Sequence, residues 1–251
     1  MANRRWRVAV TRDEDLSGPL SAALRSEGFD PQLCPVAFER PPADPSPLVD
    51  AAARLESFDW VICASARAVR ALIGARQTAW PRGVRAAAVG ARTAAALSEA
   101  GATDVFTARD AGAEALWAEL TGADRWPERR VLVPNVSGGR PELVDGLTAA
   151  GAAVTVVEAY AMEPRARADI AATWQAISPE SAIIASPSVG VRLAEAVGAQ
   201  ALQDLYAVVA MGTTTAQALR ALDVLATVPA SADFVAVAKH LGHLWASRDD
   251  V

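Results

Sequence analysis

The stretch Ala88-Val89-Gly90-Ala91-Arg92-Thr93-Ala94 returns 122 residues later as Ala210-Met211-Gly212-Thr213-Thr214-Thr215-Ala216. Residues 61–65 (VICAS) return as residues 182–186 (AIIAS) at an offset of 121. Near the start of the chain, Val8-Ala9-Val10 matches Val131-Leu132-Val133 at an offset of 123. Such constant spacing over half the chain predicts an internal repeat, and hence two similar domains with a ligand site between them.

Each repeated run is short and apolar and is followed by an Ala/Leu-rich stretch typical of a helix. Runs without strict alternation suit strands that are covered on both faces, as in parallel sheets. Gly28, Gly101 and Gly151 stand where helix C-terminal caps are expected. The pattern predicts an α/β protein with parallel sheets and right-handed crossovers.

Two proline-containing segments, residues 35–42 and 158–164, occupy equivalent positions of the repeat. Proline fixes φ and lacks a backbone donor, so both segments favour extended connections. We expect the chain to leave one domain at the first segment and to return at the second.

Composition excludes several classes of protein. A net charge of −5 over 251 residues argues against a nucleic-acid binder. Polar residues interrupt every Ala-rich segment, so we expect no membrane span. The start of the chain lacks the apolar run of a signal peptide. Together these two features predict a soluble cytoplasmic protein. Cys34 and Cys63 are expected to be small buried hydrophobic residues, and His240 with His243 lacks further ligands for a metal site.

With these segments in order, the sequence resembles the uroporphyrinogen-III synthase family over essentially its full length. The matching segments are Val10-Thr11-Arg12 followed by a helix to Gly28, Ala64-Ser65-Ala66-Arg67-Ala68-Val69, Val89-Gly90-Ala91-Arg92-Thr93-Ala94, Gly139-Arg140-Pro141-Glu142-Leu143, Tyr160, Ser186 and Gly212-Thr213-Thr214-Thr215-Ala216. The sequence departs from the family in having Ala64 and Ala185 before the two serines, and in residues 134–137, which match poorly.

The resemblance implies two flavodoxin-like domains joined by a two-segment linker. The first domain is expected to hold residues 1–36 and 165–251 and the second residues 42–157, with linkers at 37–41 and 158–164. It also implies an enzyme without metal or organic cofactor that converts hydroxymethylbilane, a linear tetrapyrrole, into uroporphyrinogen III. We expect this enzyme to be a monomer. The terminal hydroxymethyl group leaves as water, and the ring closes with inversion of the last pyrrole, for which a spirocyclic intermediate is the usual proposal.

The implied substrate carries eight carboxylates, yet the protein is acidic overall. The substrate must therefore be recognised by particular sites that bind anions, and not by the net charge of the protein. The strand-to-helix turns offer free N–H groups and the positive end of the helix dipole, and Ser65, Thr93, Ser186 and Thr215 lie in such turns. The alternative is structural, with the serines as N-caps and the threonines as first-turn residues. Arg12 is either a carboxylate clamp or a surface arginine at a turn.

Tyr160 is the candidate acid, because loss of the substrate hydroxyl needs a proton. Its alternative role is a half-buried aromatic residue that braces the linker. Three alternatives to a synthase stay open: a non-catalytic two-lobed binding protein for a small anion or sugar, a two-domain glycosyltransferase, and a degenerate family member.

Overall fold

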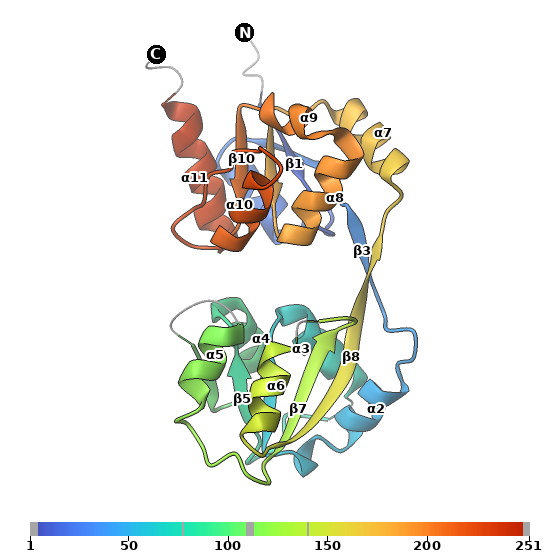
Figure 1. Cartoon of the computed structure of the whole chain (residues 1–251), viewed down its shortest axis with the longest axis vertical. Helices are drawn as coiled ribbons and strands as arrows, with labels where there is room; N and C mark the ends of the chain where they lie inside the picture. Colours follow the sequence, from blue (N-terminus) through green and yellow to red (C-terminus); the bar gives the residue numbers. More distant parts are fainter. Residues whose placement is uncertain (1–4, 77, 109–112, 140, 248–251) are drawn as a thin grey trace. The chain divides into compact units, whose positions relative to one another are not determined.

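The computed structural model describes residues 5–76, 78–108, 113–139 and 141–247. The chain divides into two compact units (Figure 1). Unit 1 takes the described residues up to Phe38 and from Glu163 onward, and unit 2 takes Glu39–Met162. The segments predicted as linkers, 37–41 and 158–164, lie in or next to strands β3 and β8, and the division between the units falls inside both strands.

Unit 1 is a parallel four-stranded sheet with the order β10-β9-β1-β2. Its strands are β1 (Arg7–Val10), β2 (Asp30–Leu33), β9 (Ser181–Ile184) and β10 (Ala207–Ala210). Its helices are α1 (Pro19–Ser26), α7 (Arg167–Ile177), α8 (Pro187–Val197), α9 (Ala199–Gln203), α10 (Thr213–Arg220) and α11 (Phe234–Ala246).

Unit 2 is built on the six-stranded sheet β3-β8-β7-β4-β5-β6. Its strands are β3 (Ala37–Arg40), β4 (Trp60–Cys63), β5 (Arg85–Ala88), β6 (Val105–Thr107), β7 (Arg130–Val136) and β8 (Ala153–Pro164). Its helices are α2 (Ser46–Ala53), the 3-10 turn Leu55–Ser57, α3 (Ala66–Ala75), α4 (Ala91–Glu99), α5 (Ala113–Leu120) and α6 (Glu142–Ala149).

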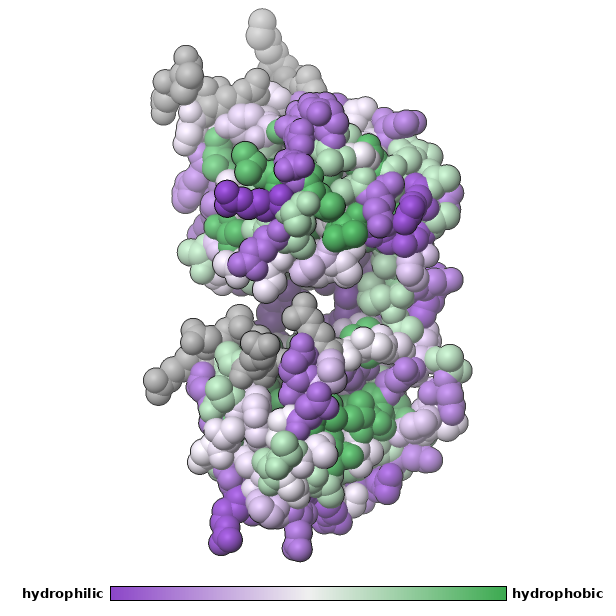
Figure 2. All heavy atoms as spheres, in the orientation of Figure 1, coloured by the Kyte–Doolittle hydropathy of each residue, from purple (hydrophilic) through white to green (hydrophobic). Residues whose placement is uncertain are grey.

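Both sheets are buried on two faces, as the non-alternating apolar runs predict. In unit 1, Val8 and Val10 pack into one core with α1 and α11, while Ala9 packs into a second core with α7 and α8. In unit 2, Val61 and Ile62 likewise belong to opposite cores. On the face drawn in Figure 2, hydrophilic residues surround small hydrophobic areas in each unit.

The repeat is confirmed by the strand order. The order β2-β1-β9-β10 in unit 1 corresponds, strand by strand, to β8-β7-β4-β5 in unit 2. The two halves of the sequence are therefore exchanged: each half gives its first two strands to one unit and its later strands to the other. Gly28, Gly101 and Gly151 end helices with φ of 87°, 96° and 87°, which confirms the predicted caps.

Candidate functional site

The predicted site residues lie at the carboxyl edge of the sheet in each unit. In unit 1, Arg12 follows β1, Ser186 follows β9 and Thr215 lies in the first turn after β10. These three strands are direct neighbours and parallel, so their carboxyl ends share one edge. This is the edge at which open α/β sheets bind ligands.

In unit 2, Ser65 follows β4 and Thr93 follows β5, its parallel neighbour. Tyr160 lies within β8 and is 9% exposed. Its hydroxyl oxygen is 3.2 Å from Ser65 Oγ, so two residues 95 positions apart in the sequence are in contact. The spacing of the two residues in the sequence does not predict this contact. The contact depends on the directions in which the side chain after β4 and the side chain in β8 point.

Ser65 is the N-cap of α3, as the structural alternative holds. Its backbone is extended, and its Oγ accepts a 3.2 Å hydrogen bond from the N–H of Ala68. Ser186 occupies the same position before α8, yet within the described part of the chain its hydroxyl accepts no capping bond. Ser186 Oγ lies instead 3.3 Å from Ser188 Oγ. The two serines therefore differ in what their hydroxyls do.

Helices α4 and α10 begin at glycines, which have no side chain to cap the first turn. Gly90 and Gly212 are both extended, with φ of −173° and −167°. The first N–H groups of a helix have no intrahelical partner, so a glycine N-cap leaves them to water or to a ligand. Both turns can therefore accept an anion such as a carboxylate.

Thr93 and Thr215 are buried, with exposed fractions of 6% and 2%. Their backbone N–H groups already bond to the carbonyls of Gly90 and Gly212. The exposed positions in these turns are the two that precede each threonine, Ala91 and Arg92 in α4 and Thr213 and Thr214 in α10. The threonines thus shape the turns from inside, and ligand contact through them is restricted to a small part of each side chain.

Arg12 is not a surface arginine at a turn, because its side chain is only 14% exposed. Its Nε lies 3.2 Å from Glu14 Oε2, and its guanidinium carbon is 4.6 Å from the centroid of the Phe234 ring. An anionic ligand at Arg12 must therefore share the guanidinium with a carboxylate of the protein.

The cysteines and histidines play no part in this arrangement. Burial raises the pKa of Cys34 to about 11 and that of Cys63 to about 12, so both stay as neutral thiols at physiological pH. Across the described residues, no three His, Cys, Asp or Glu side chains gather as metal ligands. Arg140, part of the predicted Gly-Arg-x-x-Leu segment, lies outside the described residues.

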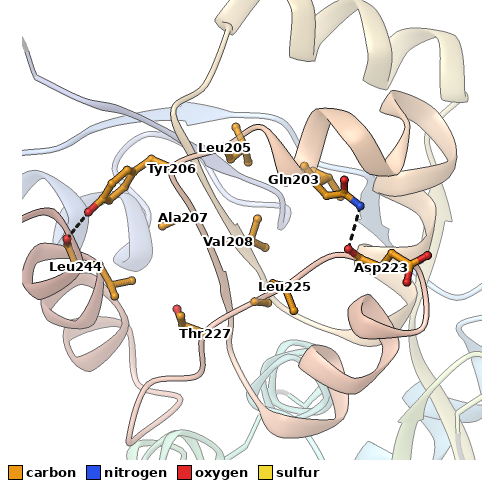
Figure 3. A pocket seen from close by; sticks show the side chains of 11 residues that line it. Gln203, Leu205, Tyr206, Ala207, Val208, Asp223, Leu225, Thr227 and Leu244 are labelled. Atoms are coloured by element: carbon orange, nitrogen blue, oxygen red, sulfur yellow. Dashed lines mark hydrogen bonds between the residues drawn. The ribbon is translucent and has the colours of Figure 1, made fainter. Parts of the chain in front are cut away.

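A cavity of about 690 Å³ lies in unit 1, at the amino end of β10 (Figure 3). Leu205, Tyr206 and Leu225 line it, and Gln203 donates a 2.9 Å hydrogen bond to the carbonyl of Asp223 beside it. None of the predicted site residues lines this cavity. It is at the opposite end of the strand from the edge at which α/β sheets bind their ligands.

Comparison with known proteins matches residues 18–238 to the family model described as uroporphyrinogen-III synthase HemD. A uroporphyrinogen-III synthase of Synechococcus elongatus is 33% identical over 164 residues, which cover 61% of this chain. The match spans 59% of that relative, less than two thirds of its length.

Two solved structures share the fold. A mutant uroporphyrinogen III synthase of the extremely thermophilic bacterium Thermus thermophilus has a TM-score of 0.67 at 21% identity, over 96% of this chain and 99% of its own. Uroporphyrinogen-III synthetase of Helicobacter pylori has a TM-score of 0.62 at 14% identity, over 95% of this chain and 99% of its own. At these identities the likeness establishes the two-unit parallel α/β fold.

Over the described residues, none of the helices is both long and apolar enough to cross a membrane.

Proposed function

Because this chain belongs to the uroporphyrinogen-III synthase family, we propose that it converts hydroxymethylbilane into uroporphyrinogen III. The observation that carries this proposal is the family match over residues 18–238. The carboxyl edge of the sheet in each unit supports it, since each offers helix N-termini suited to a polyanionic substrate. We propose the same chain to be a monomeric, cytoplasmic lyase.

In the proposed reaction, Tyr160 donates its proton to the hydroxyl oxygen at the end of the linear tetrapyrrole. The carbon–oxygen bond breaks with its electron pair on oxygen, and water leaves. The pyrrole nitrogen supplies the electrons that stabilise the resulting azafulvenium carbon. The substituted α-carbon of the last pyrrole then attacks this carbon and forms a spirocyclic intermediate. The bond from that α-carbon to the neighbouring methylene bridge breaks and leaves a second azafulvenium carbon on the bridge. The free α-carbon of the last pyrrole bonds to the bridge and loses its proton, which can return to Tyr160, and the last ring is thereby inverted.

Binding contributes more than the acid, because the substrate must be folded so that its two ends meet. We propose that substrate carboxylates bind at Arg12 and at the strand-to-helix turns that contain Ser65, Thr93, Ser186 and Thr215. The turns of α4 and α10 suit this role best, because their glycine N-caps leave first-turn N–H groups available. Positioning can supply several orders of magnitude in rate, and with acid catalysis it accounts for the reaction without a cofactor.

The test is a coupled assay in which porphobilinogen and a hydroxymethylbilane synthase generate the substrate. The porphyrinogens are oxidised and their isomers are separated by chromatography. We expect mainly the type III isomer. If only the type I isomer forms, which arises without an enzyme, the proposal is wrong and the chain is a binding protein or a degenerate member of the family.

A further inference from the structure

The hydroxyl of Ser65 has two partners, and their geometry limits what it can do. Its oxygen accepts the backbone N–H of Ala68 at 3.2 Å and lies 3.2 Å from the hydroxyl oxygen of Tyr160. A serine hydroxyl has one proton and two lone pairs. The capping bond uses a lone pair and leaves the proton of Ser65 available for the oxygen of Tyr160.

We propose that Ser65 donates this hydrogen bond to Tyr160 and is a positioning residue for the proposed acid, an inference that rests on the proposed function. With Ser65 as donor, the phenolic proton of Tyr160 points away from Ser65 and can be given to the leaving hydroxyl of the substrate. Once the proton has moved, the negative charge on the phenolate oxygen is stabilised by the Ser65 O–H, since hydrogen bonds to ionised acceptors are the stronger ones.

The surroundings hold this pair in place. Arg67, in the first turn of α3, has its Nε 2.7 Å from Glu39 Oε2 and its terminal nitrogen 3.6 Å from the sulfur of Met162. Met162 lies two residues beyond Tyr160 on β8. Arg67 thus joins the first turn of α3 to β3 through Glu39 and to β8 through Met162. The positive end of the α3 dipole adds to the stabilisation of a phenolate.

Three variants of Ser65 separate this role from capping. Ser65→Ala loses both the hydroxyl and the cap. Ser65→Gly loses the hydroxyl but keeps most of the stability of the helix start, because glycine is a tolerated N-cap. Ser65→Thr keeps both. We expect Ser65→Ala and Ser65→Gly to lower kcat by the same factor, roughly 10- to 100-fold, with little change in KM. Ser65→Thr should retain most of the wild-type kcat.

A double-mutant cycle then tests whether Ser65 acts through Tyr160. In a Tyr160→Phe background, where the phenolic oxygen is gone, Ser65→Ala should cause no further loss of kcat. The inference is overturned if Ser65→Ala lowers kcat by the same factor in both backgrounds, if Ser65→Gly behaves as wild type, or if KM rises instead of kcat falling. Failure of the proposed function gives a different result, because wild-type protein then forms no type III isomer at all.

Discussion

Oε1 of Glu14 accepts hydrogen bonds from both the backbone N–H and the hydroxyl of Ser21, at 2.7 and 2.8 Å. Ser21 is the third residue of α1, so this carboxylate neutralises the positive end of that helix. The other oxygen of Glu14 faces Nε of Arg12 at 3.2 Å. One buried acid thus caps a helix and holds the arginine that is the candidate clamp for substrate carboxylates.

Replacing Glu14 by glutamine should test this arrangement. In Glu14→Gln the amide oxygen still accepts from Ser21, while the charge that competes for Arg12 is removed. We expect KM for hydroxymethylbilane to fall by up to about tenfold, and the free energy of unfolding to fall by about 1–2 kcal/mol. Glu27→Gln, the same change at an exposed position of unit 1, is the control for net charge. An unchanged KM in Glu14→Gln would show that Arg12 does not contact the substrate.

Adding a carboxylate at the glycine N-caps should block anion binding there. Gly90 and Gly212 have extended backbones that any residue can adopt, and a Cβ at either position meets no atom within 4 Å. Gly90→Asp and Gly212→Asp should therefore fold normally, cap their helices and raise KM at least about tenfold, because the new carboxylate occupies the first-turn N–H groups.

The matched control for this prediction is Gly122→Asp, which adds the same charge to unit 2 after the C-terminal end of α5. It should leave KM close to that of the wild type. If all three variants raise KM equally, the effect comes from net charge and the turns are not carboxylate sites.

Tyr160→Phe should lower kcat about 100-fold, within the range for loss of a general acid, because phenylalanine keeps the ring and removes the proton. Because phenylalanine keeps the nearly buried ring and its packing, the thermal unfolding temperature should change little. Steady-state assays of type III isomer formation measure kcat and KM together. Near-wild-type turnover would leave Tyr160 with the bracing role alone.

Asp124 should make the stability of unit 2 dependent on pH. Trp60, which is fully buried, donates its indole N–H to Oδ2 of Asp124 at 2.8 Å, and Arg129 donates to Oδ1 at 3.1 Å. Burial acts to raise the pKa of Asp124, but the hydrogen bonds from Trp60, Arg125 and Arg129 outweigh it and hold the pKa below 3.8. A carboxyl group with a lowered folded pKa stabilises the protein above its unfolded pKa, and this stabilisation is lost as pH falls through the folded pKa.

We therefore expect Asp124→Ala to lower the free energy of unfolding by about 1–3 kcal/mol at pH 7, because the indole N–H of Trp60 loses its partner. Asp124→Asn keeps an acceptor and should cost less. Urea unfolding followed by tryptophan fluorescence at pH 7 and at pH 3 measures both effects. The difference between wild type and Asp124→Ala should shrink at the lower pH, and a constant difference would contradict the role of the charge.

Much of the fold could be predicted from the sequence because local patterns determine it. Apolar runs without alternation predicted the strands, and glycines after the helical stretches predicted the caps at Gly28, Gly101 and Gly151. The burial of Thr93 and Thr215 could also have been predicted from the sequence. Leu97 and Leu219 follow them by four residues and are buried, which places each threonine on the core face of its helix.

The contacts that define the candidate site could not be predicted in the same way. The Ser65–Tyr160 pair joins the start of α3 to β8, and Ser21 donates its hydrogen bonds to Glu14 across a loop. Both depend on side-chain directions that tertiary packing sets. The difference between Ser65 and Ser186 has the same cause, since both follow a strand and precede a helix.

The exchange of halves between the units also sets an order in which the protein can fold during synthesis. Unit 2 is one continuous stretch, Glu39–Met162, so it can form once that stretch has left the ribosome. The β1–β2 pair of unit 1 is made first but lacks its neighbour β9 until Ile184 has been added. A two-stranded pair is only marginally stable alone. Until then the open side of β1 is an unpaired strand edge, where a nascent chain can join to another copy instead of to itself.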